Sequence, residues 1–152
     1  MSLAFDVISA LQGKTLATAE SCTGGMIGSL LTSVSGASKV YKGGIVSYCN
    51  EIKHRFLSVK TETLNACGAV SAEVAMEMAE GARLGMSTDI AVSVTGLAGP
   101  QGDEFGNPVG LVYIGYSDAE QTVYRQFRFS GSRETIRQAA AEQALALILE
   151  MQ

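Results

Sequence analysis

The sequence has no pair of cysteines at the spacing of a metal or redox motif. Its three cysteines, Cys22, Cys49 and Cys67, are odd in number and scattered, which argues against a disulfide framework and a zinc ribbon and favours a reducing, cytoplasmic compartment. No apolar run approaches the ~20 residues of a membrane span, and the N-terminus lacks the basic start of a signal peptide. We therefore expect no membrane partner.

Histidine, basic charge and known phosphate-binding motifs are also scarce. The only histidine is His54, and its place on a short predicted helix gives no sign of a serine–histidine–aspartate triad. The net charge of −4 argues against nucleic acid as a partner. Neither a Walker A loop nor a Gly-x-Gly-x-x-Gly motif occurs. Asp103 and Glu104 lack further carboxylates at ligand spacing, so no metal is expected.

The chain has 152 residues, of which 47% are hydrophobic. This length and composition predict one globular domain spanning 1–152. Apolar positions at helical spacing predict helices at 3–11, 26–34, 50–57, from 71 onward and 132–150. Apolar and alternating runs predict strands at 15–20, 40–48, 89–95, 109–117 and 122–129. Between these elements, 60–68 is less regular, and 96–108 is a loop rich in glycine and proline.

The order of these elements predicts the fold class. Strands alternate with helices early in the chain, which implies parallel pairing through right-handed crossovers, and the last two strands form an antiparallel hairpin. We therefore expect an α/β fold, a three-layer α/β/α sandwich around a mixed sheet of about five strands. The strands should be mostly parallel, apart from the hairpin.

Three polar loops follow strands that should be parallel, at 20–25, 47–53 and 95–99, and such strand ends meet at one edge of an open sheet. Ser21 is the leading candidate nucleophile in these loops, although it or Thr23 equally fits the cap of the following helix. Lys53 is the available base, and Tyr48 would relay a proton or orient a substrate. The alternatives are a solvated lysine and a strand aromatic.

The same loops offer anion-binding groups. Gly24-Gly25 and the 95–99 loop can cradle a phosphate with backbone N–H groups, although tight turns explain them as well. Arg133 and Arg137 lie one helical turn apart and can grip a phosphate or carboxylate, or form a solvated first turn. Cys22 has no clear base and fits a small buried thiol better than a nucleophile.

Five segments in order resemble one family. They are Ala19-Glu20-Ser21-Cys22-Thr23-Gly24-Gly25, the stretch from Gly44 to Lys53, Gly68-Ala69-Val70-Ser71, Thr95-Gly96-Leu97-Ala98-Gly99-Pro100 and Pro108-Val109-Gly110. Together they resemble the CinA C-terminal domain family, and the resemblance covers nearly the whole chain. The chain looks like the form that stands alone, without the larger N-terminal domain that some members carry.

The resemblance implies a nicotinamide-nucleotide amidohydrolase without metal or cofactor, acting in pyridine nucleotide salvage. Such an enzyme converts nicotinamide mononucleotide and water to nicotinate mononucleotide and ammonia. By similarity, Ser21 is the nucleophile, and Tyr48 and Lys53 activate it. The implied partner is this small-molecule substrate, bound by Cys22, Thr23, Gly24, Gly25, Ser38, Thr95, Gly96, Gly99, Arg133 and Arg137.

One segment departs from the family pattern. Members usually carry a glycine-rich segment after Gly99-Pro100 and a lysine before Pro-Val-Gly, whereas this chain has acidic residues at 103 and 104 and Asn107. Added carboxylates would repel a substrate phosphate. Two other readings therefore stay open: a pyridine-nucleotide-binding module without turnover, and an amidase for a different, unphosphorylated amide. The last helix is apolar on more than one side, which predicts a homo-oligomer.

Overall fold

The computed structural model describes residues 2–152, so Met1 of the predicted 1–152 domain lies outside the described residues. Its helices are α1 (Leu3–Ala10), α2 (Met26–Thr32), α3 (Asn50–Leu57), α4 (Thr61–Cys67), α5 (Ala72–Met86) and α6 (Arg133–Glu150), with a 3-10 turn η1 (Ala37–Lys39). Its strands are β1 (Leu16–Glu20), β2 (Tyr41–Val46), β3 (Ile90–Gly96), β4 (Leu111–Ser117) and β5 (Thr122–Arg128). Every predicted strand is present, with bounds that differ by at most two residues at either end.

The strands form one sheet in the order β2-β1-β3-β4-β5. β1 pairs parallel with both β2 and β3, while β4 pairs antiparallel with β3 and β5, so β4 alone runs against the other four. Glu20 at the end of β1 pairs with Val46 on one side and with Val94 on the other. The ends of three strands therefore lie at the same level, and the expected mixed sheet is confirmed.

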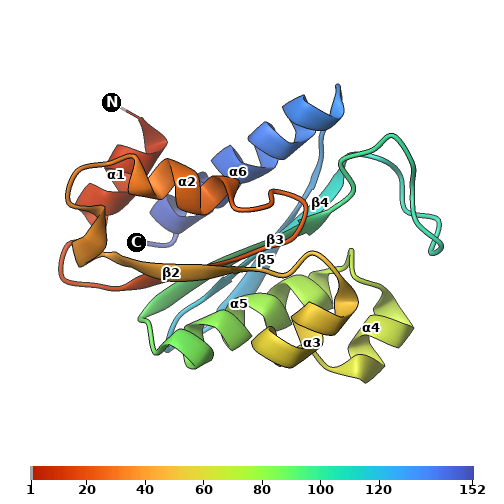
Figure 1. Cartoon of the computed structure of the whole chain (residues 1–152), viewed down its shortest axis with the longest axis horizontal. Helices are drawn as coiled ribbons and strands as arrows, with labels where there is room; N and C mark the ends of the chain where they lie inside the picture. The colour runs from red at the N-terminus through yellow and green to blue at the C-terminus, as the bar shows by residue number, and fades with distance from the viewer. Residues whose placement is uncertain (1) are drawn as a thin grey trace.

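Helices cover both faces of the sheet, as the three-layer prediction requires (Figure 1). α1, α2 and α6 lie on one face, and α3, α4 and α5 lie on the other. Alternate residues of β1 point into different cores: Leu16 packs with the first group of helices, and Ala17 and Ala19 pack with the second. Because β1 is covered on both sides, all five of its residues are buried, including the polar side chains of Thr18 and Glu20.

Residues 60–68, predicted to be less regular, form the helix α4 over most of their length. The local sequence offers no side-chain cap at its start. Instead, Glu77 from α5 accepts hydrogen bonds from the Lys60 N–H at 2.8 Å and from the Thr63 hydroxyl at 2.7 Å. A remote carboxylate therefore stabilises the helix start, and the prediction was wrong because this partner is far away in the sequence.

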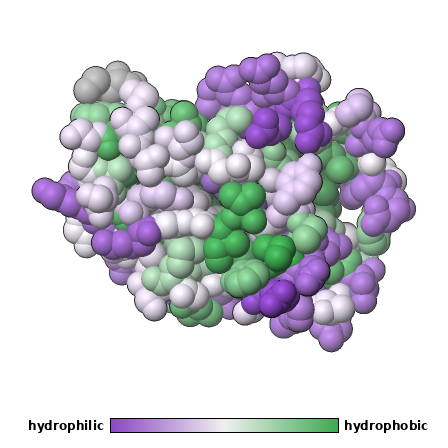
Figure 2. All heavy atoms as spheres, viewed as in Figure 1, coloured by the Kyte–Doolittle hydropathy of each residue, from purple (hydrophilic) through white to green (hydrophobic). Residues whose placement is uncertain are grey.

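β2 is an edge strand, and its side chains are alternately half-buried and exposed. Figure 2 shows hydrophobic surface near the middle of the face viewed, where β2 runs towards α3. The exposed apolar side chains of this region include Val46 and Phe56. Among residues 2–152, none of the helices combines the length and the apolar character that crossing a membrane requires.

Candidate active site

A tight turn at residues 21–25, the Ser21 turn, joins β1 to α2. Two glycines make it possible, because Gly24 and Gly25 have φ angles of 59° and 103°, in the left-handed region. Ser21 and Thr23, the predicted caps, do not cap α2, because its N-cap is Gly25. The carboxylate of Glu20 accepts the helix N–H groups instead, which leaves the Ser21 hydroxyl available for another contact.

That contact is Lys53, which α3 carries into the interior. Its side chain is 1% exposed, and its Nζ lies 3.0 Å from the Ser21 Oγ. The same nitrogen donates to the carbonyl oxygens of Ser47 at 2.8 Å and Tyr48 at 3.2 Å. Within residues 2–152 it forms no ion pair with a carboxylate. Burial lowers the pKa of Lys53 from its ordinary 10.5 to about 8.

The three contacts suit a neutral amine that acts as a base. A neutral lysine has two N–H groups and one lone pair. The carbonyls of Ser47 and Tyr48 accept the two N–H groups, and the lone pair then faces the Ser21 hydroxyl. In this state Ser21 donates its hydrogen to Lys53, which is the geometry that a serine needs in order to lose its proton.

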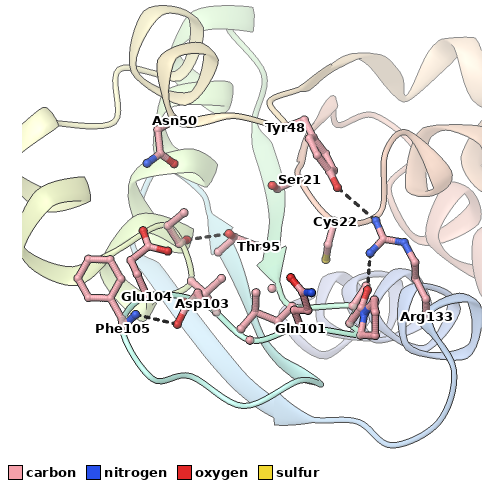
Figure 3. Close-up of a pocket in the computed structure, with 18 of the residues that line it drawn as sticks. Ser21, Cys22, Tyr48, Asn50, Thr95, Gln101, Asp103, Glu104, Phe105 and Arg133 are labelled. Atoms are coloured by element: carbon pink, nitrogen blue, oxygen red, sulfur yellow. Dashed lines mark hydrogen bonds between the residues drawn. The ribbon is translucent and has the colours of Figure 1, made fainter.

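Tyr48 contributes to Lys53 through its backbone carbonyl, whereas its side chain is 64% exposed. The Tyr48 hydroxyl accepts a hydrogen bond from Arg133 Nη2 at 3.2 Å, and Arg133 Nη1 donates to the Gly99 carbonyl at 2.6 Å (Figure 3). The structure therefore places the phenol beside Arg133 rather than between Ser21 and Lys53. A role in orienting the substrate fits this position, and a proton relay to Lys53 does not.

A pocket of about 620 Å³ opens beside Ser21. It brings together residues that follow the ends of β1, β2 and β3, as the strand-end argument predicts. The Thr95 hydroxyl in its wall donates to the Ala69 carbonyl at 2.7 Å. The predicted site residues that line this pocket are Ser21, Cys22, Tyr48, Lys53, Thr95, Gly96, Gly99 and Arg133.

Five predicted substrate-binding residues do not line the pocket: Thr23, Gly24, Gly25, Ser38 and Arg137. Thr23 is fully buried, and its hydroxyl donates to Glu20. Of the two predicted phosphate cradles, the one at Gly24-Gly25 already has internal acceptors, because Glu20 takes the N–H of Gly25 and the Ser21 carbonyl takes that of Gly24. Ser38 lies on η1, before the start of β2. It is therefore at the opposite end of the parallel strands from the pocket.

Arg137 is turned towards the protein rather than towards the pocket. It donates from Nε to the Cys22 carbonyl at 2.9 Å and from Nη2 to the Thr23 carbonyl at 3.2 Å. The structure therefore does not bring Arg137 together with Arg133 in the pocket, as a joint grip on a phosphate or carboxylate would require. The spacing of one turn placed both on one side of α6, but only the three-dimensional packing separates their roles.

Burial also decides the role of Cys22. It raises the pKa of the Cys22 thiol from 9.0 to about 11, so the thiolate is scarce at neutral pH. This agrees with the interpretation of Cys22 as a buried thiol. Among residues 2–152, no group of three histidine, cysteine, aspartate or glutamate side chains is arranged to hold a metal ion.

Other pocket residues were not among the predicted site residues, notably Asn50, Val70 and Phe105. Asn50 and Val70 belong to two of the segments that resemble the family, so the sequence did offer a reason to select them as candidate site residues. The loop at residues 100–107, the acidic loop, also borders the pocket. In it, the Asp103 carboxylate accepts hydrogen bonds from the N–H groups of Phe105 and Asn107 and from the Asn107 side-chain amide. Glu104 is exposed and lines the pocket on the side away from Arg133 (Figure 3).

A family model described as the CinA C-terminal domain matches residues 2–152. The chain belongs to this family. The CinA-like protein of Syntrophomonas wolfei is 48% identical over 136 residues, 90% of this chain and 33% of that protein. The CinA-like protein of Dictyoglomus turgidum is 48% identical over 83% of this chain and 31% of that protein. This chain thus spans about a third of the length of these curated relatives.

Solved structures of the family share the fold. The competence/damage inducible protein CihA from Agrobacterium tumefaciens matches with a TM-score of 0.93 and 39% identity, over 97% of this chain and 92% of that one. A CinA superfamily protein from Escherichia coli matches with a TM-score of 0.96 and 35% identity, over 99% of this chain and 88% of that one. These names state no reaction, so the chemistry must be argued from the site.

Proposed function

We propose that this CinA-family domain hydrolyses the carboxamide of nicotinamide mononucleotide, giving nicotinate mononucleotide and ammonia. Ser21 is the nucleophile and Lys53 is the general base. The observation that carries the proposal is the 3.0 Å contact between Ser21 Oγ and the Lys53 Nζ, in a buried setting that lowers the pKa of Lys53 to about 8. An amine with this pKa is partly neutral at physiological pH and can accept a proton.

The proposed reaction uses one proton carrier throughout. Lys53 takes the Ser21 proton while Oγ attacks the carboxamide carbon, and the carbonyl oxygen becomes negative. The carbon–nitrogen bond then breaks as protonated Lys53 returns the proton to the leaving nitrogen, which departs as ammonia. Water attacks the resulting ester with Lys53 again as the base, releasing the carboxylic acid and restoring Ser21.

Backbone N–H groups of the Ser21 turn are suited to hold the negative oxygen. Within residues 21–28, six N–H groups already have acceptors, among them Val94, Glu20 and carbonyls of the turn itself. Among the described residues, the N–H groups of Cys22 and Thr23 are the two in this stretch without an oxygen acceptor, and the Cys22 N–H lies beside its own thiol. Because Cys22 follows the nucleophile and lines the pocket, its N–H is our proposed oxyanion donor.

The family resemblance implies nicotinamide mononucleotide as the substrate, and the charge at the rim of the pocket supports a substrate that carries a phosphate. Arg133 forms no ion pair with a carboxylate among residues 2–152, and its donors contact only the Tyr48 hydroxyl and the Gly99 carbonyl. A guanidinium in this state can receive a phosphate. A volume of about 620 Å³ is in the range of pockets that hold molecules of mononucleotide size.

The acidic loop weakens this assignment less than its sequence suggests. The Asp103 carboxylate is turned into its own loop by three hydrogen bonds, two of them from Asn107. These bonds come from neutral groups and leave the Asp103 carboxylate charged, but they hold it within the loop. The Glu104 carboxylate makes no such bonds among the described residues, and it lies on the side of the pocket away from Arg133 (Figure 3).

The test is ammonia release from nicotinamide mononucleotide by the purified protein. We expect wild type to release ammonia and Ser21→Ala to lose activity by about a thousandfold or more. Ser38→Ala is the matched control, because Ser38 lies at the opposite end of the parallel strands from the pocket, and it should keep wild-type activity. Equal rates for wild type and Ser21→Ala would refute the serine mechanism.

Two other outcomes would identify the remaining readings. Calorimetry that shows binding of nicotinamide mononucleotide without any ammonia release would support a binding module without turnover. Faster hydrolysis of nicotinamide riboside than of the mononucleotide would support an amidase for an unphosphorylated amide, which the exposed Glu104 would tolerate better.

A further inference from the structure

A buried carboxylate organises the Ser21 turn from one side. Glu20 is 2% exposed, and its Oε1 accepts the Thr23 hydroxyl at 2.7 Å, the Gly25 N–H at 3.2 Å and the Ile27 N–H at 2.9 Å. Its Oε2 accepts the Gly28 N–H at 3.1 Å. No lysine or arginine pairs with Glu20 among the described residues. The positive end of α2 therefore balances its charge.

A guanidinium holds the same turn from the other side. Arg137 reaches from α6 across 115 residues of sequence to the Cys22 carbonyl and across 114 to the Thr23 carbonyl. It too lacks a carboxylate partner among residues 2–152. Two unlike charges that do not pair with each other thus hold one turn. Glu20 accepts the Thr23 hydroxyl, the Gly25 N–H and two N–H groups at the start of α2, and Arg137 donates to two carbonyl groups of the turn.

Because the peptide bond is planar, contacts that fix a carbonyl group also fix the direction of the next residue's N–H group. In a trans peptide, the C=O of one residue and the N–H of the next point opposite ways. The Ser21 carbonyl accepts the Gly24 N–H at 3.1 Å, which turns the Cys22 N–H away from the interior of the turn. Arg137 holds the Cys22 carbonyl towards α6, which turns the Thr23 N–H away from α6. These contacts therefore set the directions of the two N–H groups that lack an oxygen acceptor, and only Cys22 of the two lines the pocket.

We propose that Glu20 and Arg137 are positioning residues that hold the Ser21 turn so that the N–H of Cys22, which lines the pocket, can receive the oxyanion. The inference rests on the proposed function for the identity of the substrate. The direction of the Cys22 N–H, however, does not depend on which amide binds. Arg137 also adds positive charge at this point, and that charge opposes the rise in the pKa of the Cys22 thiol that burial causes. The same charge favours a negative oxygen.

The experiment measures the reactivity of Ser21 without the natural substrate. A fluorophosphonate reagent forms a bond from Ser21 Oγ to phosphorus, fluoride leaves, and Lys53 takes the serine proton. Intact-protein mass spectrometry gives the labelling rate. For Arg137→Met we expect labelling slower by about tenfold or more, and kcat for nicotinamide mononucleotide lower by a similar factor with KM unchanged. A role confined to stability would not produce this split.

Two further variants keep the test decisive if Arg137→Met folds poorly. Arg137→Lys keeps the charge but can hold only one carbonyl well, so it should recover part of the rate. Glu20→Gln keeps the shape but directs amide hydrogens at helix N–H groups, and it should slow labelling as Arg137→Met does. The matched control is Arg125→Met on β5, whose arginine pairs with Glu150 at the surface, and it should label at the wild-type rate.

The outcomes separate this inference from the proposed function. Labelling of wild type without ammonia release would overturn the proposed substrate, and the Arg137 variants would then decide the inference by labelling alone. Wild-type labelling rates in folded Arg137→Met or Glu20→Gln would overturn the inference. Absence of both labelling and ammonia release in wild type would overturn both proposals.

Discussion

The Ser21 turn and the loop at 100–107 lie on two sides of one pocket and are built in opposite ways. The buried carboxylate of Glu20 and the half-buried guanidinium of Arg137 hold the turn, and only two of its N–H groups lack an oxygen acceptor among the described residues. The loop mainly contacts itself, through Asp103 and Asn107, and carries the exposed side chains of Glu104 and Phe105.

This difference suggests a division of labour within the pocket. Bond-making groups need fixed positions and low exposure to water, because both strengthen electrostatic interactions. A loop that is supported mainly by its own residues tolerates substitution, because few contacts elsewhere depend on it. We therefore expect changes near Ser21 to alter the rate of reaction and changes in the loop to alter the choice of substrate.

The largest effect should come from Lys53→Met, because it removes the proposed base. We expect kcat/KM to fall by about a thousandfold. In wild type, protonated Lys53 cannot accept the Ser21 proton, so kcat/KM should rise with pH and level off above about 8. Ammonia assays from pH 6 to 10 would check this, and a flat profile would contradict a lysine base.

A smaller effect is expected on the pH dependence of the free energy of unfolding, and it also comes from Lys53. Lys53 has a pKa of about 8 in the folded protein and 10.5 when exposed, so the unfolded chain binds more protons between these values. Stability should therefore rise with pH across this window. Relative to Lys53→Met, wild type should gain about 3 kcal/mol in the free energy of unfolding between pH 8 and 10.5. Denaturant titrations of both proteins would reveal it; equal gains would indicate an ordinary lysine pKa.

Arg133→Met should affect binding rather than chemistry, because Arg133 lies at the rim and Ser21 does not contact it. We expect KM for nicotinamide mononucleotide to rise by about tenfold, with kcat nearly unchanged. The KM for nicotinamide riboside, which lacks the phosphate, should not change. Arg128→Met on the exposed side of β5 is the control. A loss of kcat with both substrates would place Arg133 in the chemistry instead.

The smallest effect should come from Glu104→Gln in the loop. Removing one exposed carboxylate should lower KM for the mononucleotide by about twofold to threefold, and less at high salt, because exposed charges are screened. Steady-state kinetics at two ionic strengths would measure it. Glu142→Gln on the exposed side of α6 should change nothing. A higher KM in Glu104→Gln would mean that Glu104 assists binding.

Much of the site follows from rules about strand ends. The alternation of strands and helices predicted that the residues after β1, β2 and β3 would meet, and Ser21, Lys53 and Thr95 do line one pocket. The direction of the Tyr48 side chain did not follow, because at a strand end it depends on the partner that it finds, here Arg133. The catalytic roles of these residues stay predictions until the assays above are made.

The sequence by itself determined the fold class, the loops that meet and the family, because periodicity and turn residues act locally and survive any detail of packing. Only the tertiary structure decided that Lys53 is buried among carbonyls, that Glu20 fills one of the two expected phosphate cradles, and that Arg137 faces away from the pocket. The physical reason is that a pKa and a hydrogen-bond partner depend on desolvation and on neighbours distant in the chain. No local pattern records these.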